Sequence, residues 1–108
     1  MEPGAYRAAL KRDLKDKYVG TPVEQLPTPA LLIDRAKVKH NIDQMRQTVE
    51  AWECLFRAHI KTHKTGEGVA LQLSKTGDGA IIVSTLAEAW GVIDETDLLA
   101  SGKVKSVS

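Results

Sequence analysis

The sequence is poor in two residue types that often hold small proteins together. Its 108 residues contain a single cysteine, Cys54, and only 5% aromatic residues. One cysteine cannot form an intrachain disulfide, and there is no Cys-x-x-Cys pair of the kind that holds structural zinc. A chain without disulfides fits a reducing compartment, so we expect a cytoplasmic protein.

A strong excess of charge of either sign is also missing. Lys and Arg together number 15 and Asp and Glu 14, which gives a formal net charge of +1. We therefore expect no nucleic-acid partner, because nucleic-acid-binding proteins usually carry a clear positive excess. A nucleic-acid site on the locally basic residues 54–75 is a weak alternative, since the next stretch, residues 76–97, is acidic.

Long apolar runs are missing as well, and we expect no signal peptide. The longest apolar runs have about four or five residues, whereas a membrane helix needs roughly 20. Residues 1–4 lack the basic start of a secretory signal, and charged residues follow them. We expect no membrane partner. The length also excludes a complete (β/α)8 barrel, which needs roughly 250 residues.

The pattern of apolar residues predicts alternating helices and strands, which favours an α/β fold with parallel βαβ units. The expected helices cover residues 4–18, a short segment after a Thr21 capping box, 35–52 after an Asp34 N-cap, 66–75, and a segment after a Thr85–Glu88 capping box. The expected strands cover residues 30–33, 54–60 and 80–83, and a turn is expected at residues 76–79. Residues 93–108 are weakly patterned.

Five ionisable residues crowd the end of the second expected strand: Arg57, His59, Lys61, His63 and Lys64. Ligands bind at the carboxyl ends of parallel strands in α/β folds. Neighbouring positive charges and partial burial would both disfavour protonated Lys61. A neutral amine can attack an aldehyde to form a Schiff base. The alternative is a solvated basic loop without chemistry.

Three segments, residues 26–34, 56–65 and 82–89, resemble the N-terminal part of the D-serine dehydratase family. This family is grouped with D-threonine aldolase and, more distantly, alanine racemase. The middle segment, Phe56–Thr65, is the most specific. Ala58 stands where many relatives have proline and resembles the fungal type. The resemblance implies an incomplete N-terminal portion of a (β/α)8 barrel that binds pyridoxal phosphate, over residues 26–108, preceded by a helical extension over residues 1–25.

The resemblance also implies roles for individual residues. Lys61 matches the family's lysine that holds pyridoxal phosphate, and His59 and Arg57 are expected beside the cofactor. The implied reaction is β-elimination of a small D-amino acid, D-serine, to pyruvate and ammonia. Full-length members are expected to be homodimers.

Other parts of the family's site have no counterpart in this sequence. The resemblance places the zinc ligands of full-length relatives, a histidine and a cysteine, in a later β domain, and Cys54 lies in the wrong segment to replace them. The cofactor's phosphate is expected to bind later barrel strands. We expect the chain to stop just before the next strand, as a truncated product that is inactive by itself.

Several alternatives stay open. A D-threonine aldolase-like carbon–carbon lyase would use the same lysine, and a non-catalytic fragment or interaction module would use none. His59 and His63 could be a metal pair, although two histidines are too few for zinc. Arg57 either orients the site or pairs with a carboxylate on a neighbouring helix. We expect Lys64 to be solvated.

Overall fold

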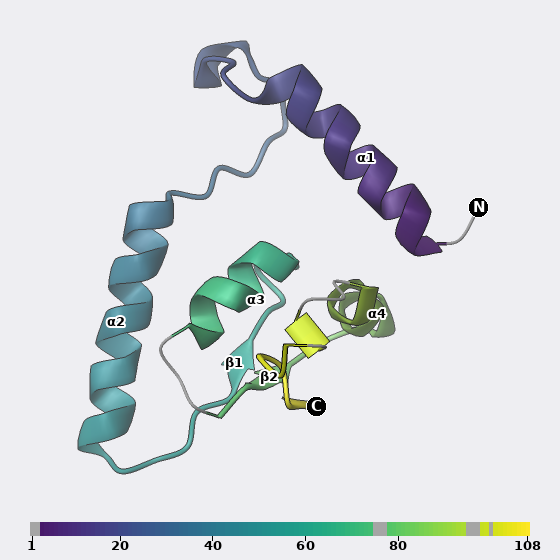
Figure 1. Cartoon of the computed structure of the whole chain (residues 1–108). Coiled ribbons are helices and arrows are strands. Elements are labelled where there is room, and N and C mark those ends of the chain that lie inside the picture. Colours follow the sequence, from purple (N-terminus) through teal and green to yellow (C-terminus); the bar gives the residue numbers. More distant parts are fainter. Residues whose placement is uncertain (1–2, 75–77, 95–97, 100) are drawn as a thin grey trace. The chain divides into compact units, whose positions relative to one another are not determined.

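The computed structural model describes residues 3–74, 78–94, 98–99 and 101–108. The chain divides into two compact units, Met1–Ile33 and Asp34–Ser108. The second unit is a mixed α/β structure with a small parallel sheet (Figure 1). Among the described helices, none is long and apolar enough to cross a membrane.

The first unit consists of helix α1 (Pro3–Tyr18) and the short 3₁₀ helix η1 (Val23–Gln25). The helix expected over residues 4–18 is confirmed, and Gly20 follows it with φ +87°, a conformation that favours glycine. The predicted Thr21 capping box is wrong. Pro22 takes the cap position of η1 and no side chain caps it, because the helix is too short to offer the N–H groups that such a box binds.

The strand predicted over residues 30–33 is also wrong. Leu31, Leu32 and Ile33 are 71%, 57% and 52% exposed and lie outside any strand. An isolated strand gains no ladder hydrogen bonds, and none of the described strands pairs with this run. The run is apolar, as a buried strand would be, but no described strand pairs with it and buries it.

The second unit begins with helix α2 (Arg35–Ala51). The side chain of its N-cap Asp34 accepts a hydrogen bond of 3.1 Å from the Lys37 backbone N–H, as predicted. Helix α2 contacts helix α3 (Gly66–Leu73), and helix α4 (Leu86–Asp94) also packs against α3. Lys75 and residues 76–77 of the predicted helix end and turn lie outside the described residues.

Three short parallel strands form the sheet in the order β1 (Ala58–His59), β2 (Ala80–Ile82) and β3 (Ser106–Val107). Ala58 pairs with Ile81, which in turn pairs with Val107. The predicted strands at residues 54–60 and 80–83 are confirmed at shorter lengths. Strand β3 was not predicted, so the expectation that the chain stops before the next strand is wrong. Its sequence has no apolar run, and only pairing with β2 defines it.

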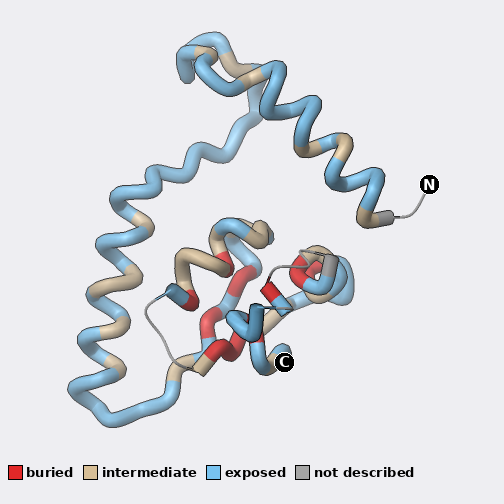
Figure 2. The backbone as a smooth tube through the Cα atoms, in the orientation of Figure 1, coloured by how far each residue is buried: buried red, intermediate tan, exposed pale blue. Residues whose placement is uncertain are grey.

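Buried residues gather in the second unit, on and around the strands (Figure 2). The core lies on one face of the sheet, and the other is here called the open face. The core packs strand residues against α3 and α4, and comprises Ala58, Ile60, Val69, Leu73, Ile81, Val92, Leu98 and Val104. Side chains alternate along a strand, so Arg57, His59 and Ile82 belong to the opposite face. Arg57 and His59 are exposed, and Ile82 is partly buried.

The fold predicts a strong dependence on Ile81, whose side chain is fully buried in the central strand. Replacing Ile81 with alanine should lower the free energy of unfolding by about 2–5 kcal/mol, through lost burial and a residual cavity. Urea unfolding followed by circular dichroism measures this. The matched variant Ile33→Ala, at a half-exposed site, should change stability by less than about 0.5 kcal/mol. Equal losses in both would contradict the assigned core.

Candidate functional site

The candidate site lies at the edge where β1 and β2 both end, here called the rim (residues 59–64 and 83–88). Because the two strands are parallel and paired Ala58 to Ile81 and His59 to Ile82, their following loops leave the sheet side by side. The first loop carries the basic cluster, and the second carries Ser84, Thr85 and the start of α4. The two loops therefore lie at one edge of the sheet.

Lys61 stands two residues beyond β1, and its side chain is exposed. The partial burial expected from the sequence is wrong, because the loop turns outward directly after buried Ile60. Within the described residues, the Lys61 ammonium group has neither a hydrogen-bond nor an ion-pair partner. The rim thus presents one uncommitted primary amine to the solvent.

The imidazole of His59 links the two loops of the rim. Its Nδ1 accepts a hydrogen bond of 3.2 Å from the Lys61 backbone N–H. Its Nε2 lies 3.4 Å from the Ser84 hydroxyl oxygen. A ring whose Nδ1 accepts must carry its proton on Nε2 when neutral, so neutral His59 donates to Ser84. His59 is thereby tied to the backbone of the residue proposed to react.

Arg57 fastens the three strands together on the open face of the sheet. Its Nη1 donates hydrogen bonds to the Ile81 carbonyl oxygen at 3.3 Å and to the Ser106 hydroxyl at 2.9 Å. These partners are a carbonyl and a hydroxyl, and not the helix carboxylate that the alternative expected for Arg57. Its side chain spans from β1 to β3, and its role beside a cofactor stays a prediction.

His63 has a packing role within the first loop and α3. Its Nε2 lies 2.8 Å from Gln72 Oε1, and its Nδ1 accepts a 3.1 Å hydrogen bond from the Thr65 N–H. The ring lies so close to Gly68 that any Cβ there would collide with it. Gln72 also donates to the His59 carbonyl oxygen at 3.3 Å. Both nitrogens of His63 are therefore engaged within this layer.

The structure brings no metal-ligating set together in the part of the chain that it describes. Groups of three or more His, Cys, Asp or Glu side chains with suitable spacing do not occur there. His59 and His63 each use both ring nitrogens in other contacts, so these contacts disfavour the metal-pair alternative. The one cysteine, Cys54, is free and exposed.

Glu88 is the rim residue that sequence reasoning missed as part of the site. Its side chain is only 3% exposed, yet it lies 3.5 Å from Lys64 Nζ through Oε1 and accepts a 2.6 Å hydrogen bond from the Ser84 N–H through Oε2. The Ser84 N–H, and secondly the charge of Lys64, lower the pKa of Glu88, although burial opposes them. Lys64 is exposed, as expected, but it also forms an ion pair with Glu88.

The predicted capping box explains how Glu88 reaches this position. Thr85 Oγ1 accepts a hydrogen bond of 3.2 Å from the Glu88 N–H, as an N-cap should. The carboxylate then turns back over the first turn of α4 and binds Ser84, one residue before the cap. The capping signal was visible in the sequence, but the contact with Lys64 was not.

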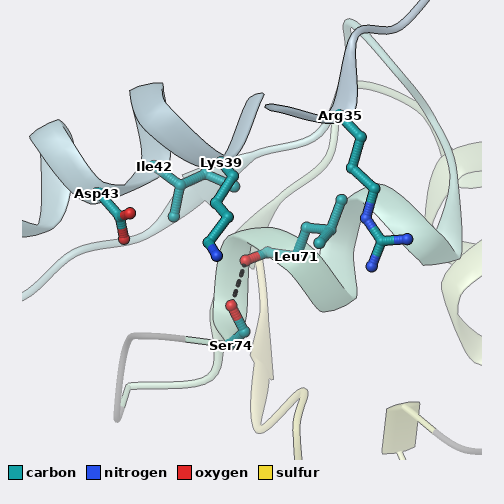
Figure 3. A pocket seen from close by; sticks show the side chains of 6 residues that line it. All are labelled: Arg35, Lys39, Ile42, Asp43, Leu71 and Ser74. Atoms are coloured by element: carbon teal, nitrogen blue, oxygen red, sulfur yellow. Dashed lines mark hydrogen bonds between the residues drawn. The ribbon is translucent and has the colours of Figure 1, made fainter. Parts of the chain in front are cut away.

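One hollow in the second unit lies away from the rim. It sits between α2 and α3 and is lined by Arg35, Lys39, Ile42, Asp43, Leu71 and Ser74 (Figure 3). The Ser74 hydroxyl donates to the Leu71 carbonyl oxygen at 2.7 Å, so it serves the end of α3. None of the rim residues lines this hollow, which therefore belongs to helix packing.

Comparison with known proteins connects this geometry with a family. The chain is 42% identical to a D-serine dehydratase from Schizosaccharomyces pombe over 94 residues, which cover 87% of the chain and 22% of the relative. The chain is a homologue of the D-serine dehydratases. No family model matches the sequence.

Two further proteins are similar to this chain. A D-serine dehydratase from Saccharomyces cerevisiae is 36% identical over an alignment of 108 positions that covers 89% of the chain and 25% of the relative. A D-threo-3-hydroxyaspartate dehydratase from a Delftia species is 41% identical over 64 residues, or 59% of the chain. The chain spans about a quarter of the length of the first two relatives.

The lowered pKa of Glu88 predicts how acid affects stability. In the folded state the pKa of Glu88 lies below its ordinary value of 4.5. The ionised carboxylate therefore stabilises the fold above pH 4.5, and this stabilisation is lost as the pH falls through the lowered pKa. Between pH 7 and acid, the unaltered chain should lose more unfolding free energy than the Glu88→Gln variant. Urea unfolding at a series of pH values measures the difference. Parallel curves for the two proteins would contradict the assigned contacts.

Proposed function

We propose that this chain carries the cofactor-attaching lysine of a pyridoxal-phosphate-dependent dehydratase that acts on small 3-hydroxy D-amino acids, D-serine foremost. The observation that most supports this proposal is the free amine of Lys61 at the rim, where two parallel strands end. The similarity to two proteins named D-serine dehydratase extends over most of the chain, including this motif.

The same proposal extends to the fold. Three parallel strands with helices on one face and an open, partly polar second face are what a portion of a (β/α)8 barrel would look like. In such a barrel the open face, with Arg57 and His59, would face the interior. The expected division into an extension over residues 1–25 and a barrel portion over residues 26–108 stays part of this proposal.

The residues at the rim fit the covalent attachment of pyridoxal phosphate. Attachment needs an accessible amine, and Lys61 offers one without competing partners among the described residues. When bound, the cofactor supplies an electron sink for the electron pair that stays on the substrate's α-carbon when the α-proton is removed. His59 accepts a hydrogen bond from the Lys61 backbone N–H and contacts Ser84 through Nε2, and its ring would help to hold the cofactor.

The remaining parts of the reaction are proposed to come from outside this chain's described residues. Binding of the cofactor's phosphate, and polarisation of the leaving hydroxyl by zinc as the resemblance implies, both need further ligands. We propose that the chain by itself lacks dehydratase activity, and that the whole protein is a cytoplasmic homodimer. A D-threonine aldolase-like activity is the second candidate, because it would use the same lysine.

Attachment at Lys61 can be tested directly on this chain. Incubation with pyridoxal phosphate, reduction with borohydride and peptide mass spectrometry should place most of the label on Lys61. The Lys61→Arg variant should lose that label, whereas Lys39→Arg, which removes an exposed lysine of α2, should keep it. Label spread evenly over the exposed lysines would contradict the proposal.

A test of the substrate class requires a complete active site. Exchanging this chain for the matching quarter of the Schizosaccharomyces pombe relative gives a testable hybrid. We expect the hybrid to release pyruvate from D-serine, and to lose at least about a thousandfold in rate on Lys61→Arg, as loss of a covalent group does. Glycine from D-threonine without pyruvate from D-serine would favour the aldolase. Neither product from a folded hybrid would favour a non-catalytic module.

A further inference from the structure

A single buried carboxylate joins the two loops of the rim. Glu88 belongs to α4, but its two oxygen atoms contact residues of different loops: Lys64 after β1 and the Ser84 backbone after β2. Its side chain is 3% exposed, whereas that of Lys64 is 58% exposed. Burial makes a lost partner costly, because a buried charge without compensation is strongly unfavourable.

The Lys64 contact acts on the turn that carries Lys61. This turn begins at Ile60, which is 1% exposed, and it closes where the Lys64 N–H donates to the Ile60 carbonyl oxygen at 2.9 Å. Lys64 has φ +52°, a left-handed backbone conformation that is strained for a residue with a side chain. Among the described residues, this hydrogen bond and the ion pair with Glu88 are the contacts of Lys64 that oppose relaxation of the strained turn.

The Ser84 contact acts on His59. Glu88 Oε2 accepts the Ser84 N–H at 2.6 Å, and the Ser84 hydroxyl faces His59 Nε2 at 3.4 Å. His59 Nδ1 in turn accepts the Lys61 N–H. Two chains of contacts therefore lead from Glu88 to Lys61, one through Lys64 and the turn, the other through Ser84 and His59.

We infer that Glu88 is a positioning residue that holds Lys61 and His59 in a fixed arrangement at the rim through Lys64 and Ser84. The inference rests on the proposed function for the meaning of Lys61, and deepens it by assigning the group that orients the amine. Within the described residues, Glu88 forms no hydrogen bond or ion pair with Lys61 or His59, so its effect on them is indirect. The charge matters as well as the shape, because Lys64 is held by an ion pair.

Variants of both partners separate positioning from general stability. Glu88→Gln keeps an oxygen for the Ser84 N–H but removes the charge that Lys64 needs, and Lys64→Met removes the same ion pair from the other side. Lys64→Arg preserves the pair and should rescue. Glu24→Gln, on the exposed η1, is the matched control. Circular dichroism and urea unfolding identify conditions in which every variant is folded.

The positioning readout is the borohydride-fixed pyridoxyl label at Lys61, measured relative to exposed Lys15 of α1. This ratio should fall about fivefold to tenfold in Glu88→Gln and in Lys64→Met, the size of coupling expected between contacting residues. It should stay near the unaltered value in Lys64→Arg and Glu24→Gln. Equal ratios in all five proteins would overturn the inference and leave the proposed function standing.

A second readout works without the cofactor. Amide hydrogen exchange, resolved by nuclear magnetic resonance, should be faster at Lys64 in Glu88→Gln than in Glu24→Gln, because the turn hydrogen bond to Ile60 opens more often. Unchanged exchange at Lys64 would overturn the inference whatever the label shows. If Lys61 takes no label in the unaltered chain, the proposed function fails, and exchange alone decides whether Glu88 holds the turn.

Discussion

The parallel register of β1 with β2 is the constraint on which the arrangement of this protein depends. Ala58 opposite Ile81 buries one face of both strands against α3 and α4, and a shift by one residue would turn those side chains outward. Because the strands run in the same direction, their loops leave at one edge. Residues about 25 positions apart, His59 and Ser84, meet there as a consequence.

The same alternation that builds the core also sorts the polar residues. On the open face, Arg57 is committed to the carbonyl of Ile81 and the hydroxyl of Ser106, which stabilises the strand order. At the rim, His59, His63, Lys64 and Glu88 are each held by partners from another segment. Lys61 differs from them, since its amine is left without a partner in the described part of the chain. An ordered surrounding with one uncommitted nucleophile is a reasonable starting point for covalent catalysis.

Homology and geometry support the proposed chemistry in different ways. Identity of 42% and 36% to D-serine dehydratases covers most of this chain but only about a quarter of those proteins. The geometry adds an explanation of how this quarter could present a lysine, because it shows which contacts hold the turn around Lys61. Arg57 and His59 are exposed on the open face of the sheet, and under the proposed function this face would line the interior of a barrel.

Local signals in the sequence determined much of the secondary structure. The Asp34 and Thr85 caps, helix α1 and the apolar strands around Ala58 and Ile81 depend on neighbouring residues, so their patterns could be read directly. The cluster around Lys61 was equally visible, because its residues are adjacent in the chain.

Tertiary structure alone decided the contacts between distant segments. Strand β3 exists because β2 offers it hydrogen bonds, and Leu31–Ile33 stay exposed because no described strand offers them any. The pairing of Lys64 with Glu88, and of Arg57 with Ser106, depends on how the loops and strands are brought together in space. Such contacts leave no periodic trace in the sequence, since either partner alone resembles an ordinary surface charge.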